Sequence, residues 1–346
     1  MIAKVLVLLQ EKKYALVKQA VLEMNAVDIA EVFAELHELE APQTSLRLFR
    51  LMPKELAAET FSYMESDVQQ SIIEAISDNE LRFILDDMYM DDYVDLIEEM
   101  PANVVKRLLA NSSDENRKLI NEYLQYPEDS AGSIMTNEYV YFRRNVTVRE
   151  AFDIIRKTGV DKETIYTCYV ISTERKLEGV VTVRELLLAD PNAAVDTIMS
   201  TNVIHAHTLD DKEEIAKLFS RYDMLSLPVV DKEERLVGII TIDDAVDVMQ
   251  EANTEDFEMM AGIAHSDDTY LKMPVVSLAK NRIIWLLVLM FSAMITGAML
   301  EHYEAAIATL PLLVSFIPML MDTGGNCGSQ ASTMIIRGMA LDEIEP

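Results

Sequence analysis

A stretch without a single charged residue, from Ile283 to Leu300, most constrains what this chain can fold into. It approaches the roughly 20 apolar residues that an α-helix needs to cross a bilayer. Trp285 and Tyr303 lie near its ends, where amphipathic rings favour the membrane interface. We therefore predict a membrane-spanning helix. The competing interpretation, a buried hairpin of a soluble protein, fits the length of the stretch less well.

A second weakly charged stretch follows after a short acidic turn, so that helices at about 283–303 and 306–338 would form a transmembrane hairpin. Lys280, Arg282 and Arg337 flank this hairpin, whereas the turn between the helices has no Lys or Arg. Because basic residues concentrate on the cytoplasmic side of membrane proteins, the long N-terminal region is expected in the cytoplasm. The chain is expected to be a multi-pass protein of the plasma (inner) membrane.

Glycines and polar side chains gather in the second helix of this hairpin. Backbone groups left unsatisfied in lipid are costly, and polar groups at membrane depth usually mark a transport path. Close helix packing through small residues is the alternative. The candidates for lining or supporting a pore are Pro318, Thr323, Gly324, Gly325, Asn326, Gly328 and Gln330.

The region before the membrane is strongly acidic. The whole chain has a net charge of −29, and its part from Asn281 onward has two basic and six acidic residues, which leaves a net charge of −25 before Asn281. Such a surface repels nucleic acid and attracts cations. The two cysteines provide no disulfide framework, and Cys168 reads as a small core residue.

Residues 1–130 show apolar residues at helical spacing in short segments, with helix starts about a dozen residues apart. We therefore predict an all-α superhelical domain of stacked short helices, none of which could bury its apolar face alone. Pro53 and Pro101 suit helix starts, and so do Asp91 and either Ser77 or Asp78.

An internal duplication follows between about Met135 and Met249. The segment Gly179–Thr182 matches Gly238–Thr241 at an offset of 59 residues, and each copy reads as strand, helix, two strands and helix. This pattern resembles a tandem pair of CBS domains, an α/β fold that senses ligands in many proteins. In such pairs a Thr-x-x-Asp often holds the ribose of an adenine nucleotide, so Thr241 and Asp244 could bind ATP. A helix N-cap is an equally good explanation.

No catalytic constellation is evident, so we predict that the chain is not an enzyme. The pair His205 and His207 is interpreted as alternating strand positions. Carboxylates are more informative, because Asp91 and Asp95 share a helix face. Asp243, Asp244 and Asp247 repeat the arrangement at the end of the second CBS copy. Each could be a solvated residue, and Asp91 a helix cap, but two acidic faces could be bridged by Mg²⁺.

The order of helical domain, CBS pair and membrane helices resembles the MgtE magnesium transporter family over the whole chain. The stretch 318–330 looks like the family's P-x-L-x-x-T-G-G-N-x-G-x-Q signature, and 126–136 looks like its junction into the first CBS copy. The domains would then be a helical N-terminal domain (1–130), CBS 1 (131–197), CBS 2 (198–256), a connecting helix (257–281) with Pro274 inside it, and a transmembrane region (282–346).

The resemblance implies a homodimer in the lipid bilayer that imports Mg²⁺, and it implies that cytosolic Mg²⁺ draws the two soluble domains together and closes the pore. The implied ligands of Mg²⁺ are Glu59, Asp91, Asp95, Asp244, Asp247 and Glu255. A further acidic position of the family is Ala252 here.

The resemblance implies five membrane helices, of which this sequence contains two. We therefore expect it to end before the helix that supplies the family's pore aspartate, and to sense Mg²⁺ without conducting it alone. A membrane-anchored sensor of Mg²⁺ or adenine nucleotide without transport is the second hypothesis, and an enzyme regulated by CBS domains is the third.

Overall fold

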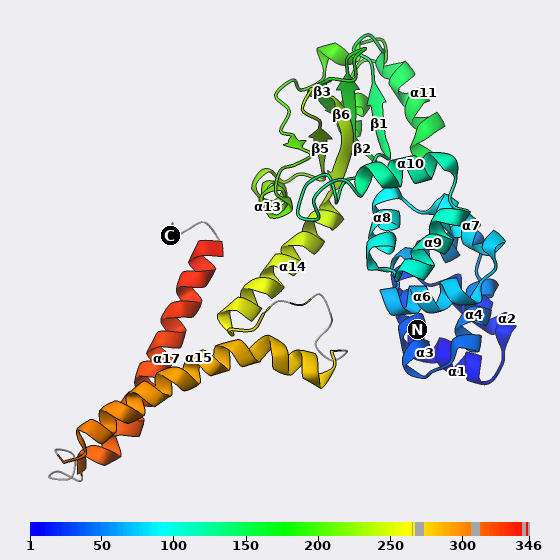
Figure 1. Cartoon of the computed structure of the whole chain (residues 1–346). Coiled ribbons are helices and arrows are strands. Elements are labelled where there is room, and N and C mark those ends of the chain that lie inside the picture. The colour runs from blue at the N-terminus through cyan, green and yellow to red at the C-terminus, as the bar shows by residue number, and fades with distance from the viewer. Residues whose placement is uncertain (265, 267–272, 306–311, 341–343, 345–346) are drawn as a thin grey trace. The chain divides into compact units, whose positions relative to one another are not determined.

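The structure is a computed structural model, and it describes residues 1–264, 266, 273–305, 312–340 and 344. The chain divides into two compact units, Met1–Ala245 and Val246–Pro346, which are described separately below. The first unit contains an all-helical region and two small sheets, and the second contains long helices (Figure 1).

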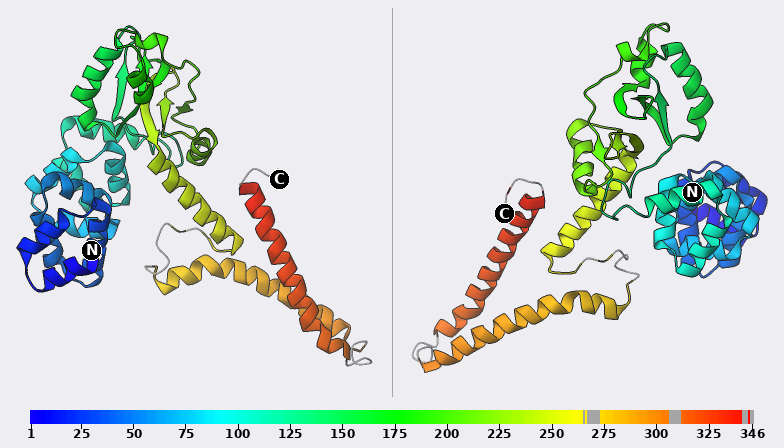
Figure 2. Two further views of the ribbon diagram at one scale, coloured as in Figure 1. Left: turned by 180° about the vertical axis from the view of Figure 1, so that it is seen from behind. Right: turned by 45° about the horizontal axis from the view of Figure 1, so that its top comes forward.

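The N-terminal region consists of ten helices, nearly all of eight to ten residues. Each is too short to be stable alone, so most of its stability must come from packing. The views of Figure 2 show them stacked against one another, and fully buried side chains such as Phe33, Phe61 and Leu81 fill the space between them. The expected all-α domain of stacked short helices is confirmed. The helices are α1 (Ile2–Gln10), α2 (Tyr14–Val21), α3 (Ala26–Glu38), α4 (Pro42–Leu51), α5 (Lys54–Ser62), α6 (Ser66–Ala75), α7 (Asp78–Asp87), α8 (Met90–Glu99), α9 (Ala102–Asn111) and α10 (Asp114–Tyr123).

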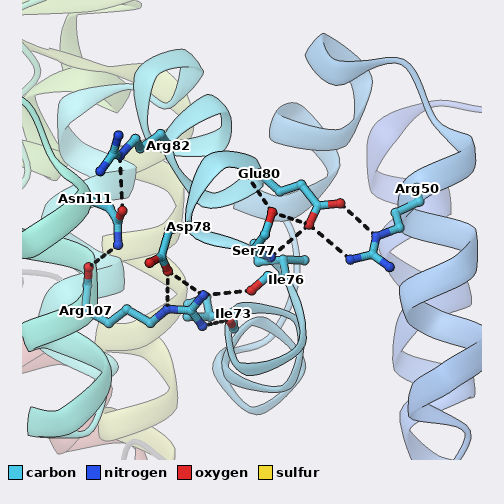
Figure 3. Close-up of polar contacts among 9 residues, drawn as sticks. All are labelled: Arg50, Ile73, Ile76, Ser77, Asp78, Glu80, Arg82, Arg107 and Asn111. Carbon is cyan, nitrogen blue, oxygen red and sulfur yellow. Dashed lines mark hydrogen bonds and ion pairs between the residues drawn. The ribbon is translucent and has the colours of Figure 1, made fainter.

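One arginine joins three of these helices. Arg107 of α9 donates to Asp78 Oδ1 at the start of α7, over 3.0 Å from Nε and 2.8 Å from Nη2 (Figure 3). Its other donors reach the carbonyl oxygens of Ile73 and, at 2.7 Å, Ile76. The guanidinium therefore satisfies carbonyls at the C-terminal end of α6, which have no partner within that helix.

A second polar contact joins α4 to α7. Arg50 Nε and Nη2 donate to the two carboxylate oxygens of Glu80 over 2.7 and 3.1 Å (Figure 3). The same Glu80 accepts from the backbone N–H of Ser77, whose hydroxyl caps the helix, so Ser77 is confirmed as a helix start. The arginine lowers the pKa of Glu80 to about 2, chiefly through these hydrogen bonds.

Two copies of one α/β unit follow. In each copy the first and second strands are parallel and the second and third are antiparallel, and their spatial order is β1-β2-β3 and β4-β5-β6. Val170 pairs with Gly179 in the first copy, and Val229 pairs with Gly238 in the second, as the offset of 59 residues requires. The elements are β1 (Tyr139–Phe142), α11 (Val148–Thr158), η1 (Gly159–Asp161), β2 (Thr164–Ile171), β3 (Leu177–Thr182), α12 (Val183–Leu188), η2 (Val195–Thr197), β4 (Ala206–His207), α13 (Lys212–Tyr222), β5 (Ser226–Val230) and β6 (Leu236–Thr241).

Each copy contributes its leading segment to the other. Thr136 forms an antiparallel bridge with Ile239, and Ser200 forms the equivalent bridge with Val180. Glycine is needed beside each bridge, because a Cβ on Gly238 would lie 2.9 Å from the Thr136 carbonyl oxygen. The duplicated sequence therefore folds as one interlocked pair.

The second unit contains most of α14 (Ile242–Met260), α15 (Val275–His302) and α17 (Leu312–Ala340). Of the helices among the described residues, α15 alone is long and apolar enough to cross a membrane. The structure does not contain the single connecting helix that was predicted for residues 257–281. The first residues of this segment belong to the end of α14, and Pro274 is the N-cap of α15 rather than a residue within a helix. Residues 267–272 of that segment lie outside the described residues.

Candidate metal site and nucleotide site

Helix α8 carries two acidic residues of the predicted metal site. Tyr89 is its N-cap, so Asp91 and Asp95 lie within the helix, one turn apart on one face. The other face is anchored by Tyr93, which is fully buried and whose hydroxyl contacts the hydroxyl of Ser112 and lies 3.4 Å from the Leu108 carbonyl oxygen. This anchoring fixes the direction in which the carboxylates point.

Asp91 is the most buried carboxylate of this site, with 9 % of its surface exposed. The explanation as a helix cap is wrong, since its Oδ1 accepts only the adjacent N–H of Asp92, over 3.0 Å. Burial raises its pKa well above the usual range, and the charges of Asp244, Asp92 and Glu163 raise it further. A buried carboxylate surrounded by carboxylates is expensive unless a cation compensates it.

Asp244, from the second CBS copy, lies near Asp91 and Asp95 of α8. Its Oδ2 accepts the Thr241 hydroxyl over 2.7 Å, yet loss of hydration and the charges of Asp243 and Asp92 raise its pKa to about 6. The Asp95 side chain reaches solvent, but partial desolvation raises its pKa, and the charges of Asp92 and Asp244 raise it further, to about 7. Residues from α8 and α14 are therefore close enough to interact electrostatically.

Glu163, just before β2, is a member of the site that the sequence analysis missed. Burial, Asp243 and Asp244 raise its pKa to about 8. Its Oε2 is buried, and no hydrogen-bond partner for it exists among the described residues. No spacing in the sequence links it to α8, so only folding reveals it. We define the acidic cluster as the carboxylates of Asp91, Asp92, Asp95, Glu163, Asp243 and Asp244.

This donor set fits a hard divalent cation. Mg²⁺ prefers carboxylate oxygens and retains several of its waters. The partnerless Oε2 of Glu163 and the buried Asp91 are oxygens that such an ion could satisfy.

The remaining predicted ligands are placed less directly. Burial raises the pKa of the Tyr63 hydroxyl, and the charges of Glu59 and of three carboxylates of the cluster raise it further. Because Glu59 and the cluster act on the same tyrosine, Glu59 lies near the edge of the cluster. Asp247 and Glu255 lie on α14 within the second unit, and their role stays a prediction.

The predicted nucleotide residues form a helix cap. The backbone N–H of Thr241 also reaches Asp244 Oδ2, over 3.3 Å, and in the first copy Thr182 and Glu185 form the equivalent capping box. A cavity of about 320 Å³ lies beside Thr182 rather than beside Thr241. Its lining residues are Thr167, Val180, Thr182, Asn202, Val203, Ile204, Tyr222, Asp223, Met224, Leu225, Ser226 and Pro228.

The predicted pore residues all lie on α17. The helix continues without interruption through Pro318 and the segment 323–330, so the irregular backbone that the glycines suggested is absent from the described residues. A Cβ on Gly324, Gly325 or Gly328 would have no neighbour within 4 Å among the described residues outside the nearby turns of its own helix. Asn326 donates to Asp322 Oδ2 over 3.3 Å. Their role in a pore stays a prediction.

Comparisons with known proteins agree with this arrangement. The profile of the MgtE intracellular N domain matches residues 24–129, and that of the CBS domain matches residues 131–192 and 195–251. A magnesium transporter MgtE of Thermus thermophilus is 34% identical over 97% of this chain and 77% of its own length. The chain belongs to the MgtE family. The family consists of transporters rather than enzymes, which confirms the prediction of a non-enzymatic protein.

Other members of the family support the same assignment. The magnesium transporter MgtE of Bacillus subtilis is 30% identical over 99% of this chain and 75% of its own length. A crystal structure of the cytosolic domain of the Mg²⁺ channel MgtE in complex with ATP, 34% identical, covers 72% of this chain and 100% of that chain with a TM-score of 0.66. The soluble part of a magnesium transporter, 28% identical, also gives a TM-score of 0.66 over 72% of this chain and 96% of that chain.

Proposed function

We propose that this MgtE homologue imports Mg²⁺ across the plasma membrane as a channel or transporter, and that cytosolic Mg²⁺ regulates it through the acidic cluster. The relatives described above are named magnesium transporters, and α15 is apolar enough to span a bilayer. The chain is proposed to act as a homodimer, with its N-terminal and CBS domains in the cytoplasm.

One observation carries the regulatory part of this proposal: carboxylates of the helical and CBS domains lie close enough that their charges, together with desolvation, raise one another's pKa values. The main charges acting on Asp91, Asp95 and Asp244 are all other carboxylates. When these groups are ionised they repel one another and favour separation of the domains. A bound Mg²⁺ would offset that repulsion and favour the closed arrangement.

This arrangement is a two-state equilibrium biased by its ligand. The ion can shift the equilibrium only by the difference between its affinities for the closed and open states. The closed state offers carboxylates from two domains, whereas each domain alone offers fewer, so the closed state should bind Mg²⁺ more tightly. The proposed ligands are Glu59, Asp91, Asp95, Asp244, Asp247 and Glu255, and we add Glu163.

ATP is proposed as a ligand of the CBS pair. The cytosolic domain of a relative crystallised with ATP, and the cavity beside Thr182 has a volume within the range of small-molecule sites. Tyr222 and Met224 line this cavity and provide apolar surface for a base, and Thr182 and Ser226 provide hydroxyls.

Hydrogen exchange on the full chain in detergent tests the regulatory proposal. Millimolar Mg²⁺ should slow exchange in α8 and at the start of α14. The variant Asp91→Asn, which keeps the side-chain shape, should need more Mg²⁺ for the same protection. Glu185→Gln, a capping carboxylate outside the cluster, is the matched control and should behave as the wild type. Equal Mg²⁺ dependence in Asp91→Asn and the wild type would contradict the assigned site.

Transport is tested separately, by reconstituting this sequence, extended by the further membrane helices expected from the family, into vesicles that contain a Mg²⁺-sensitive dye. We expect influx that falls as Mg²⁺ rises on the side bearing the soluble domains. Intact Mg²⁺-dependent protection without influx would favour the second hypothesis, a membrane-anchored sensor without transport of its own.

A further inference from the structure

Two histidines and a glutamate converge at the surface of the second CBS copy, away from the residues of the acidic cluster in sequence. His205 and His207 flank Ala206 of β4, whose side chain is fully buried, so both imidazoles point to the opposite side. Glu234 comes from the turn between β5 and β6. Ligand atoms of these three residues all lie within 4.8 Å of one another.

The distances in this group fit metal ligands better than direct hydrogen bonds. His205 Nε2 lies 3.5 Å from Glu234 Oε2, and His207 Nε2 lies 3.4 Å from Glu234 Oε1. Hydrogen bonds between nitrogen and oxygen are usually 2.7–3.2 Å long. Ligands held 2.0–2.1 Å from a tetrahedral zinc ion are about 3.3 Å apart, which follows from the tetrahedral angle.

The second nitrogen of each imidazole faces an acceptor. His205 Nδ1 lies 3.2 Å from the Val203 carbonyl oxygen, within hydrogen-bond distance, whereas His207 Nδ1 lies 3.7 Å from Asp210 Oδ2, which is too long for a direct hydrogen bond. Asp210 is itself positioned, because Oδ2 accepts the backbone N–H of His207 over 2.7 Å. Metal-binding histidines usually donate their other N–H to a carbonyl or carboxylate, which directs the remaining lone pair at the ion.

The backbone holds Glu234 in place as well. Glu234 adopts a φ of 63°, a left-handed backbone conformation within the turn. Asp231 Oδ1 accepts from the N–H groups of Glu233 and Arg235, each over 2.9 Å, and so braces the turn. The carbonyl oxygen of Glu234 accepts from the Leu177 N–H of the first CBS copy over 3.1 Å.

The geometry points to a transition-metal site of the Zn²⁺ class formed by His205 Nε2, His207 Nε2 and the carboxylate of Glu234, with water as a fourth ligand. Imidazole suits Zn²⁺ and its neighbours in the first transition row, whereas Mg²⁺ prefers oxygen ligands. Side-chain exposures of 32% for His205, 46% for His207 and 54% for Glu234 leave the site open to ions from solution.

Such an ion would connect β4 to the β5–β6 turn, and through the Leu177 hydrogen bond it would stiffen the junction of the two CBS copies. The inference does not depend on the proposed function, because it uses none of the carboxylates of the acidic cluster. It gives the CBS pair a response to a class of metal ion that the acidic cluster, built only from oxygen ligands, is not suited to bind.

Co²⁺ provides a direct probe, because its visible absorption bands report imidazole ligation and tetrahedral geometry. The full chain in detergent would carry Cys327→Ser, which removes an exposed thiol that also binds zinc. We expect Co²⁺ bands that Zn²⁺ abolishes and excess Mg²⁺ does not. His207→Gln and Glu234→Gln should each weaken binding at least about tenfold.

His37→Gln is the matched control, because His37 Nε2 pairs with Asp67 Oδ2 over 3.6 Å on the helical domain, outside any three-ligand group among the described residues. It should bind Co²⁺ as the parent does. A parent protein without imidazole bands, or unchanged affinity in both His207→Gln and Glu234→Gln, would overturn the site. Hydrogen exchange gives an independent readout, since Zn²⁺ should slow exchange at the Leu177 amide in the parent but not in Glu234→Gln.

Discussion

Replacing Asp244 by asparagine tests whether burying an ionised carboxylate in the acidic cluster destabilises the folded protein. Asparagine keeps an oxygen that can accept from the Thr241 hydroxyl, which lies 2.7 Å from Asp244 Oδ2, and it removes the charge. The pKa of Asp244 rises from 3.8 to about 6 on folding, chiefly through loss of hydration and then through the charge of Asp243. At about 1.36 kcal/mol per pKa unit, the ionised form costs about 3 kcal/mol.

The sign of the pH dependence follows from the direction of this shift. Below pH 3.8 the carboxyl is protonated in both the folded and unfolded protein, so the shift has no effect on stability. Between this pH and about pH 6 the unfolded chain releases its proton first, and the folded state loses stability as pH rises. Without divalent cations, Asp244→Asn should therefore be more stable than the wild type at pH 8 and about equal to it near pH 4.

Calorimetry of the full chain in detergent with EDTA measures this difference. About 3 kcal/mol corresponds to an increase in Tm of roughly 6–12 °C for a unit of this size. Glu185→Gln is the matched control, because Glu185 caps α12 in the same way but lies in the first copy at an exposed position. Mg²⁺ should raise the Tm of the wild type more than that of Asp244→Asn. Equal Tm values for Asp244→Asn and the wild type at pH 8 would refute the cost assigned to the ionised carboxylate.

Three further changes test the framework around these sites. Arg107→Ala removes hydrogen bonds that join α9 to α6 and α7, so urea unfolding followed by circular dichroism should show a loss of about 2 kcal/mol, and an unchanged midpoint would contradict this role. Gly238→Ala brings a methyl group within 2.9 Å of the Thr136 carbonyl oxygen and should cost about 1–3 kcal/mol by the same measurement. Tyr169→Phe leaves the Ser226 hydroxyl, 2.8 Å from the lost oxygen, without this buried partner and should cost about 1–3 kcal/mol, whereas retained stability would argue against the bond.

The fold was largely predictable from the sequence because its signals are periodic. Apolar residues at helical spacing indicated the short helices of residues 1–130, and the repeat of Gly179 at Gly238 indicated two copies with one strand register. The length of the uncharged stretch in α15 indicated a membrane helix. Each of these signals can be read within one segment, without knowledge of long-range contacts.

The sites were only partly predictable, because they depend on contacts between distant segments. Asp91 and Asp95 were visible as a pair on one helix, but Glu163 precedes a strand with no pattern that marks it. The pair His205 and His207 was interpreted as alternating strand positions, since its glutamate partner arrives only when β5 and β6 form their hairpin. Pro274 was placed inside a helix that in fact begins after it.

The crossed bridges of the CBS pair have a consequence for how its two halves can move. Thr136 is tied to Ile239 and Ser200 to Val180, so each half is fastened to the other at both ends of the repeat. A pull exerted on α14 reaches the first copy without passing through a hinge between the copies. A half transplanted on its own would lose the bridge that the other half adds to its sheet, so the pair should be transferred as one piece.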